Sequence, residues 1–522
     1  MIQTQIIFSS ARSVTIELLN MGIYETAIAY EIFIDGILRK ETNKIVTSIY
    51  GLNPATTYEI AIKYKGEISS FFVTTKKEFV TLNVKDFGAK GDGKKDDTGA
   101  IQAAILSCPP KSRVYIPQGI YKITSLFLKS NLILEIGENA VLSAFTERSK
   151  FAILPGVIQS YDEEGEYNLG SWEGNPLDTF ASIITGIHVE NVVICGQGMI
   201  DGCTDFDNWW KHTATKEGGA FRPRMIFLNH CENIILQGIT VQNSPSWNIH
   251  PYFTNYFKAI NIKVLGPADS CNTDGLDPES CNDVEIVGCY FSVGDDCIAL
   301  KSGKIYMGKK LKTPSQKIRI RQTCMRDGHG AITLGSEIAA GVNDLKVENC
   351  LFLNTDRGLR IKTRRGRGKD SILDKIEFKN IIMDHVKAPF VANSFYFCDP
   401  DGRGSYVGTL EALPVDDRTP ILGSFKFTNI SCTNCHFTGA YIHGLPEQKI
   451  KSIIMENVNI SYCEEAQSGE AAMMLACEPT CKQGIFIHNA EQVILRDVSV
   501  TGNEGEPLLL DCIDKLSIEY SM

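Results

Sequence analysis

The stretch that decides the fold is C-N-D-V-E-I-V-G-C-Y-F at residues 281–291, because its pattern recurs along the chain. A polar turn is followed by a short strand of alternating apolar residues, then by a second turn and a second strand. Most successive units start about 24 to 34 residues apart, a spacing typical of a coiled repeat fold with loop insertions. Related units begin at Val189, Cys231, Phe257, Ser315 and Val342.

Strand-only repeats of this length predict an all-β, right-handed parallel β-helix over residues 79–522. Leucine-rich repeats are disfavoured because the L-x-x-L-x-L pattern is missing, and propeller blades because each unit has too few strands. In a β-helix, equivalent residues on neighbouring coils stack about 4.8 Å apart. Residues far apart in sequence can therefore form one surface row.

Residues 1–78 differ from the repeats and predict a small β-sandwich of short alternating strands. Asp35-Gly36 fits a hairpin turn, and Leu52-Asn-Pro-Ala-Thr-Thr-Tyr58 resembles the tyrosine corner of fibronectin type III domains. Such a module can position substrate or act as a spacer, but packing against the larger domain is the favoured interpretation. A helix starting at Asp97 or Thr98 is expected to cap the first coil.

The composition limits the partners of the chain. With a net charge of −10 and no apolar run of membrane-spanning length, we expect no nucleic-acid partner and no membrane. The 17 cysteines form no small disulfide framework and no recurrent ligand pair, so no metal and no cofactor are expected. The sequence after Met1 lacks a signal-peptide pattern, which favours a cytoplasmic location; the alternative is a periplasmic or secreted protein whose signal peptide has been removed.

Four short motifs fall near one point of successive coils and carry the chemistry. Asp274 precedes Asp295 by 21 residues, about one coil, so both are expected on one exposed face. Hydrolysis of a glycosidic bond needs one carboxylic acid and one carboxylate, and the cluster supplies both. Asp295 and Asp296 would face opposite sides of a regular strand, so both reach this face only if the chain bends at Gly294. The motifs are Asn272-Thr-Asp274-Gly, Gly294-Asp295-Asp296, Gly328-His329-Gly330 and Arg360-Ile361-Lys362.

These motifs, in this order, resemble the polygalacturonases of glycoside hydrolase family 28, and the likeness runs from about Phe79 to the C-terminus. The resemblance implies that Asp295 is the general acid and that Asp274 and Asp296 activate water for single displacement with inversion. It implies that His329 tunes the proton network near the acid. Asp277 is interpreted as a supporting group and Asp283 as a turn residue. Expected substrate-binding residues are Arg360, Lys362, Asn272, Trp247, His250 and, from the basic tract that follows, Arg365.

Long insertions are expected to build the binding face. They cover residues 155–178, the region of Trp209 and Trp210, and residues 393–417. If they close one end of the groove the enzyme would cut from chain ends, as in the similar bacterial exo-acting members with a fibronectin-like front domain.

The leading hypothesis is hydrolysis of α-1,4-galacturonan, an anionic polysaccharide or its oligomers, from the non-reducing end. A rhamnogalacturonan or substituted-galacturonan hydrolase keeps the same fold. The alternatives of another class are a calcium-dependent pectate lyase and a non-catalytic carbohydrate-binding solenoid.

Overall fold

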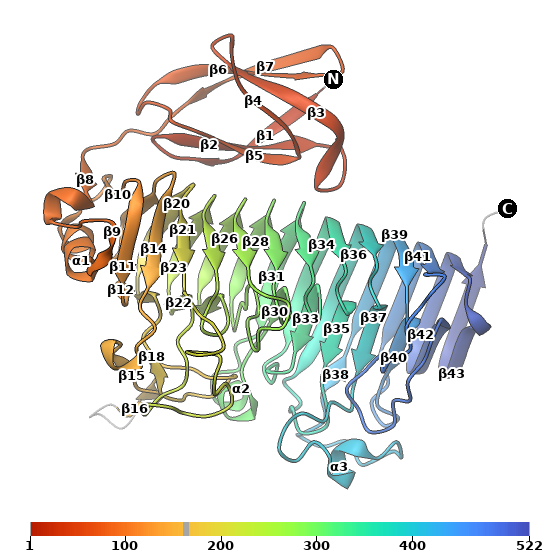
Figure 1. Ribbon diagram of the computed structural model, residues 1–522. Coiled ribbons are helices and arrows are strands. Elements are labelled where there is room, and N and C mark those ends of the chain that lie inside the picture. The colour runs from red at the N-terminus through yellow and green to blue at the C-terminus, as the bar shows by residue number, and fades with distance from the viewer. Residues whose placement is uncertain (1, 160–165, 521–522) are drawn as a thin grey trace.

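The computed structural model describes residues 2–159 and 166–520 and confirms the predicted all-β architecture. Figure 1 shows a long parallel β-helix with a smaller antiparallel module lying along one side of its N-terminal half. The insertions project from the other side of the coil. No helix among the described residues is long and apolar enough to span a membrane.

The N-terminal module consists of two antiparallel sheets around one apolar core. Asp35 and Gly36 connect two of its strands, as predicted. The hydroxyl of Tyr58 accepts a hydrogen bond from the backbone N–H of Asn53 at 2.9 Å, which is the tyrosine-corner contact. One sheet contains β1 (Gln3–Ser9), β2 (Ser13–Leu19) and β5 (Val46–Tyr50), and the other β3 (Glu25–Ile34), β4 (Ile37–Lys44), β6 (Thr57–Tyr64) and β7 (Glu67–Thr74).

Helix α1 (Thr98–Ser107) lies at the start of the coil with Ile101, Ala104 and Ile105 buried. Asp97 occupies the N-cap position but makes no side-chain cap hydrogen bond. Its carboxylate instead accepts hydrogen bonds from the backbone N–H groups of Lys90 and Gly91, at 2.7 and 2.9 Å. The preceding turn therefore takes the carboxylate that would otherwise cap the helix.

Parallel strands stack into three rows along the coil. The first row is β8 (Thr81–Asn83), β10 (Arg113–Ile116), β13 (Leu132–Ile136), β20 (Glu190–Gly196), β23 (Glu232–Gln237), β26 (Asn255–Ile260), β28 (Asn282–Val287) and β31 (Ser315–Arg321). The second is β9 (Asp92–Asp96), β11 (Gly119–Ile123), β14 (Ala140–Ala144), β21 (Met199–Asp201), β24 (Thr240–Gln242), β27 (Lys263–Leu265), β29 (Tyr290–Ser292) and β32 (Cys324–Arg326). The third is β12 (Leu126–Phe127), β19 (Ile184–Ile187), β22 (Ile226–Asn229), β25 (Ile249–Tyr252), β30 (Ile298–Leu300), β33 (Ile332–Gly335), β35 (Arg357–Lys362), β37 (Ala388–Asn393) and β40 (Thr438–His443).

Longer strands continue these rows towards the C-terminus. Four of them continue the first and second rows together: β34 (Val342–Leu353), which pairs with β31 and β32, and then β36 (Ile372–Asp384), β39 (Ser424–Cys435) and β41 (Ser452–Tyr462), each of which pairs with the long strand before it. The last coils are formed by β42 (Gln483–Thr501) and β43 (Glu504–Glu519). Short elements in the insertions and connections are β15 (Ile153–Leu154), β16 (Ile158–Gln159), β17 (Glu166–Tyr167), β18 (Thr179–Phe180), β38 (Ile421–Leu422), α2 (Ile305–Leu311) and α3 (Ser405–Gly408).

Asparagines in left-handed conformation form a ladder at the turn between the first and second rows. The side-chain amide of Asn380 donates to the amide oxygen of Asn349 at 3.0 Å, and Asn429 donates to Asn380 at 3.1 Å. Asn457 continues the ladder to Asn429. Asparagine tolerates a positive φ and pairs with its own kind one coil away, which explains the Asn-rich turns of the repeat.

Candidate active site

The register of the third row brings the first and second aspartate motifs together. Leu276 bridges to Ile298, and the backbone N–H of Gly275 donates to the carbonyl of Asp296 at 2.9 Å. Asp274 therefore aligns with Asp296 on the next coil, and not with Asp295 as the 21-residue spacing suggested.

The predicted bend at Gly294 is present, and it brings both neighbouring aspartates to one side. One carboxylate oxygen from each of Asp274, Asp295 and Asp296 lies within 4.8 Å of the others. Gly294 is required for space, since a Cβ there would lie 2.4 Å from the carbonyl oxygen of Ser270.

Asp296 is fully buried and held by two cations. Its carboxylate accepts from Nη1 of Arg360 at 2.9 Å and from Nζ of Lys362 at 2.8 Å. Burial alone would raise the pKa of Asp296, but Lys362 and Arg360 outweigh it and hold this pKa far below the usual range. Ile361, between the two cations, points into the core as expected. Asp296 thus fixes these two side chains while its carboxylate stays in the cluster with Asp274 and Asp295, and its expected role in activating water stays a prediction.

Asp274 lies beside a buried lysine that the sequence analysis missed. Nζ of Lys301 lies 3.5 Å from Asp274, 3.6 Å from Asp277 and 3.1 Å from Glu337. Burial first, and then the charge of Asp295, raise the pKa of Asp274 to about 7, while Lys301 opposes the rise. Burial and the neighbouring Asp274 also raise the pKa of Asp277, which is consistent with a supporting group.

Asp295 pairs with His329 at the open side of the site. Nδ1 of His329 lies 3.4 Å from Oδ1 of Asp295, and the His329 side chain is 49% exposed. Although burial opposes it, the hydrogen bond from His329 lowers the pKa of Asp295. The same bond raises the pKa of His329. The pair therefore keeps one proton between its two members up to a higher pH than a free histidine would.

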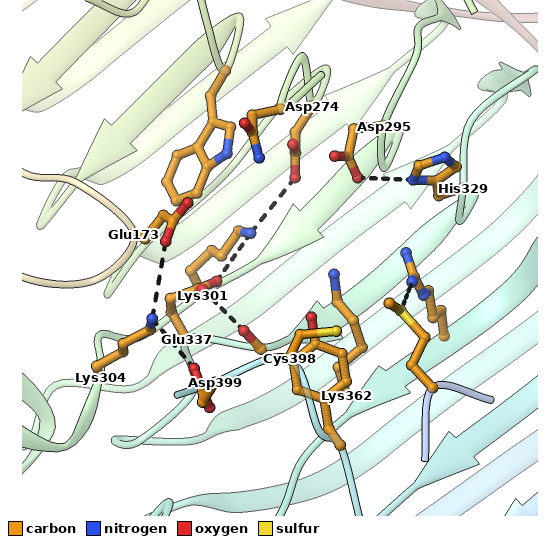
Figure 2. Close-up of a pocket in the computed structure, with 16 residues that line it drawn as sticks. Glu173, Asp274, Asp295, Lys301, Lys304, His329, Glu337, Lys362, Cys398 and Asp399 are labelled. Carbon is orange, nitrogen blue, oxygen red and sulfur yellow. Dashed lines mark hydrogen bonds and ion pairs between the residues drawn. The ribbon is translucent and has the colours of Figure 1, made fainter. Parts of the chain in front are cut away.

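A cavity of about 320 Å³ opens above these groups (Figure 2). Three insertions contribute to its wall: Glu173 comes from the first, and Cys398 and Asp399 come from residues 393–417. Met473 comes from a further insertion that the sequence analysis did not single out. Residues 160–165 of the first insertion lie outside the described residues.

Lys304 joins two of these insertions across one end of the cavity (Figure 2). Its Nζ lies 3.3 Å from Asp399 and 4.0 Å from Glu173. The insertion that contains Trp209 and Trp210 instead buries both rings, and neither lines the cavity.

Trp247 and Asn272 line the cavity as predicted, whereas His250 does not. Lys301 lies over the indole of Trp247, with Nζ 4.3 Å from the ring centroid. His250 is fully buried, and its Nε2 lies 2.9 Å from Oε2 of Glu279. The prediction that His250 binds substrate is therefore wrong: Ile249 faces the core of the coil, and the outward-facing ring of His250 is covered and packs against Trp247, with ring centroids 4.9 Å apart.

Arg365 is also misassigned as a substrate-binding residue. It is 1% exposed, and its guanidinium donates to Glu447 at 2.6 Å and to the carbonyl of Thr409 at 2.7 Å. Arg364 and Arg367 both pair with Asp399. The basic tract after Lys362 therefore holds the insertion at residues 393–417 in place.

The three clustered aspartates have the spacing of a cation site, but their surroundings do not favour one. Lys301 contacts Asp274, and Arg360 and Lys362 contact Asp296. These fixed positive charges already compensate the carboxylates and would repel a divalent ion. The geometry therefore disfavours the calcium-dependent lyase.

A parallel β-helix with clustered carboxylates in a cationic pocket defines a polysaccharide-cleaving glycoside hydrolase. The chain belongs to glycosyl hydrolases family 28, whose family model matches residues 162–477.

Its relatives include a probable polygalacturonase of Vitis vinifera, 29% identical over 395 residues that cover 74% of this chain and 75% of the relative. The exo-poly-alpha-D-galacturonosidase of Dickeya chrysanthemi is 24% identical over 406 residues, which cover 68% of this chain and 65% of the relative. Among solved structures, the family 28 exopolygalacturonase of Yersinia enterocolitica aligns with a TM-score of 0.72 at 20% identity. That alignment covers 99% of this chain and 98% of the other, so the likeness in fold includes the N-terminal module.

Proposed function

We propose that the protein hydrolyses α-1,4-galacturonosyl linkages of polygalacturonate and its oligomers from the non-reducing end. The observation that carries the proposal is the cavity that joins Asp274 and the Asp295–His329 pair to the cations Lys301, Lys304, Arg360 and Lys362. Carboxylates supply acid and base, and the cations complement uronate carboxylates. The family and the activities in the names of its relatives support the same substrate class.

The Asp295–His329 pair supplies the proton. Asp295 donates it to the glycosidic oxygen as the bond from C1 to that oxygen breaks, and His329 holds the proton in the free site. Water forms the new bond to C1 and passes a proton to Asp274. Asp274 is ionised above about pH 7, and Lys301 stabilises this charge. Arg360 and Lys362, fixed by Asp296, face the substrate.

The spacing of the carboxylates differs from the expectation for inversion. The nearest oxygens of Asp274 and Asp295 lie within 4.8 Å, whereas acid and base in inverting enzymes are usually about 6.5–9.5 Å apart. Inversion is nevertheless the proposal, because the likeness to family 28 implies single displacement, in which Asp274 acts as the base for water. Proton NMR of the first product anomer decides: an α-linked substrate should release the β-anomer, and early α-anomer would contradict single displacement.

One assay separates hydrolysis from the alternatives. We expect polygalacturonate to yield reducing ends that are insensitive to chelator, with no absorbance of an unsaturated uronide. An absorbance rise that chelator abolishes would identify a lyase. Release from rhamnogalacturonan alone would identify the related hydrolase, and no release from any substrate would favour a binding solenoid.

The first variant to test is Asp295→Asn. Removing the acid should lower kcat by about 10²–10⁴-fold or more without unfolding the coil, since the side chain lies at the rim of the cavity. Circular dichroism checks the fold, and turnover near that of the wild type would overturn the acid assignment.

The location proposed is the cytoplasm. All 17 cysteines are free thiols, most of them buried inside the coil. Such thiols persist in a reducing compartment, where short galacturonate oligomers would be the substrate. Fractionation of cells with an antibody against the protein tests this, and recovery outside the cytoplasmic fraction would contradict it.

A further inference from the structure

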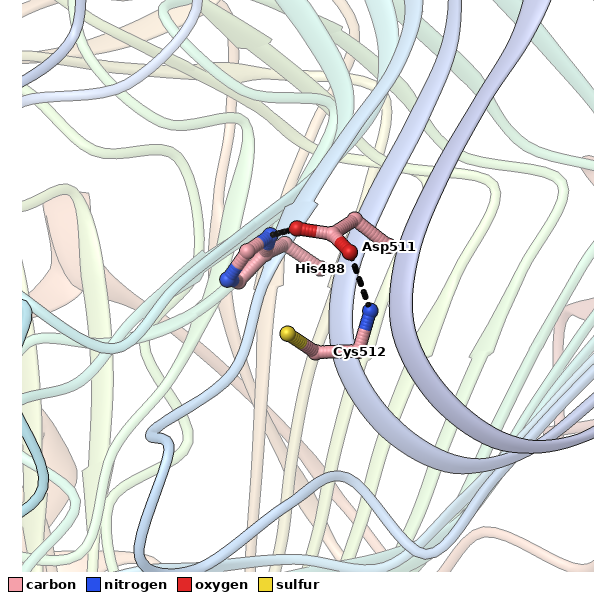
Figure 3. Close-up of side chains that lie close together, drawn as sticks. All are labelled: His488, Asp511 and Cys512. Carbon is pink, nitrogen blue, oxygen red and sulfur yellow. Dashed lines mark hydrogen bonds and ion pairs between the residues drawn. The ribbon is translucent and has the colours of Figure 1, made fainter.

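A histidine, an aspartate and a cysteine converge on the last two coils, away from the active site. His488 on β42 is the register partner of Asp511 on β43, and Cys512 follows directly. Nδ1 of His488 lies 3.3 Å from Oδ2 of Asp511. One ligand atom from each of the three residues lies within 4.8 Å of the others. Figure 3 shows the thiol and the imidazole ring on the same side of the strand.

The turn at Cys512 has the left-handed backbone that is common at the turns of this coil. Its φ is +54°, and Cys203, Lys317 and His385 have values of +52° to +54°. On the preceding coil this position is Asn489, whose amide donates to the carbonyl of Gly444 at 3.0 Å. A cysteine offers no comparable amide, so local backbone bonding does not account for the residue. The thiol of Cys512 is a soft metal ligand, and the imidazole of His488 beside it is a borderline one.

We propose that His488, Asp511 and Cys512 bind one divalent transition-metal ion of the zinc type. Imidazole nitrogen, carboxylate oxygen and thiolate sulfur are the donors that zinc takes, and a water molecule completes a tetrahedral set. The thiol loses its proton to solvent as the bond from sulfur to the metal forms. All three side chains are accessible enough to exchange the ion.

A second histidine, His443, lies next to His488. The ring of His443 lies with its centroid 4.8 Å from that of His488, and its buried Nδ1 has no hydrogen-bond partner among the described residues.

The bound ion would tie the terminal coil to the coil before it. His488 belongs to β42, whereas Asp511 and Cys512 belong to β43. Leu516 and Ile518 of β43 are 50% and 42% exposed, so little apolar burial holds this part of the strand. A metal that binds only the folded coil stabilises it by mass action.

Cobalt(II) titration of the purified, metal-stripped protein tests the proposal. We expect one equivalent to produce a thiolate-to-cobalt charge-transfer band and the visible bands of tetrahedral cobalt. Cys512→Ser should lose the charge-transfer band, and His488→Gln should weaken binding. Cys271→Ser, which removes another exposed thiol, is the matched control and should keep the band.

A second measurement is independent of the spectrum. Zinc should raise the melting temperature of the wild type and of Cys271→Ser, but not that of Cys512→Ser. Because Cys512 is exposed, its serine variant should fold, which circular dichroism checks. Absence of a charge-transfer band in the wild type, or its persistence in Cys512→Ser, would overturn the proposal.

Discussion

At the scale of single residues, two neighbouring aspartates of the active site should affect stability with opposite sign. Asp274 has a folded-state pKa of about 7, above the value of about 3.9 in an unfolded chain. A raised carboxyl pKa gives stability below the unfolded value, and this stability is lost as pH rises through 7. Asp274→Asn should therefore raise the melting temperature at pH 8 by the equivalent of a few kcal/mol and by roughly a third as much at pH 5.

Asp296 is the matched comparison, because its folded-state pKa lies far below the unfolded value. Its stabilising contribution is present above about pH 4 and is lost only as pH falls through the folded-state pKa. Asp296→Asn leaves Arg360 and Lys362 buried without their carboxylate and should cost about 3–5 kcal/mol at both pH 5 and pH 8. Scanning fluorimetry of both variants at the two pH values is the measurement. Loss of stability in Asp274→Asn at pH 8 would contradict the charge distribution inferred for the site.

The same residues show what could be predicted from the sequence. The repeat period places Asp274, Asp296 and Arg360 near one another, because a β-helix converts a spacing into a row. The repeat period does not show which residue a cationic side chain pairs with. Arg365 pairs with Glu447, 82 residues away on a loop outside the repeat, so its partner leaves no local signal. Lys301 was detectable, since it follows the G-D-D motif directly after β30 and aligns with Glu279 one coil earlier.

At the scale of elements, the two insertions joined by Lys304 should determine how short chains bind. Lys304→Ala removes the contacts with Glu173 and Asp399, so one end of the cavity should loosen. We expect KM for short galacturonate oligomers to rise by about tenfold, as for loss of roughly 1.4 kcal/mol of binding, with a smaller change in kcat.

Lys309 provides the control, because it lies in α2, the helix that follows Lys304, but outside the cavity. Lys309→Ala should leave both constants unchanged. Products of mixed size from Lys304→Ala would indicate that the closed end restricts the wild type to chain ends. An unchanged KM would show that the contact is not part of the binding site.

The asparagine ladder should contribute measurably to the stability of the coil. Asn380 has a φ of +55° and hydrogen-bonds to Asn349 and Asn429. Asn380→Ala should cost about 2–4 kcal/mol, from two hydrogen bonds and the left-handed backbone together. Asn380→Gly keeps the backbone freedom and should cost less. Urea unfolding measures both, and equal losses would show that backbone strain plays no part.

At the scale of the whole molecule, the N-terminal module lies on the first row of the coil, whereas the active site lies on the third. Gln237 of β23 donates to the hydroxyl of Ser48 at 2.9 Å, and Ile260 and Val287 join the core of the module. Figure 1 shows the module and the insertions on different sides of the coil. These contacts agree with the expectation that the module packs against the larger domain. The module does not contribute to the lining of the cavity.

Arg321 is the main ionic link between module and coil and tests this arrangement. It donates to Glu17 of the module at 2.9 Å and to Glu285 of the coil at 2.6 Å. Arg321→Ala leaves Glu17 almost buried without its partner, at a cost of up to about 3–5 kcal/mol. We expect faster proteolysis in the connection at residues 75–80 and an earlier unfolding of the module. Because the third row is untouched, kcat/KM should stay within about twofold of the wild type.

Arg319→Ala is the control, because Arg319 lies on the same strand but pairs with Asp344 within the coil. It should leave proteolysis of the connection unchanged. A second substitution, Glu17→Gln, removes the unpaired charge and should restore part of the stability lost in Arg321→Ala. If Arg321→Ala instead lowered kcat/KM strongly while the coil stayed folded, the module would have to influence the cavity through the coil. The separation of rows would then be insufficient to explain its role, and packing alone would no longer account for the module.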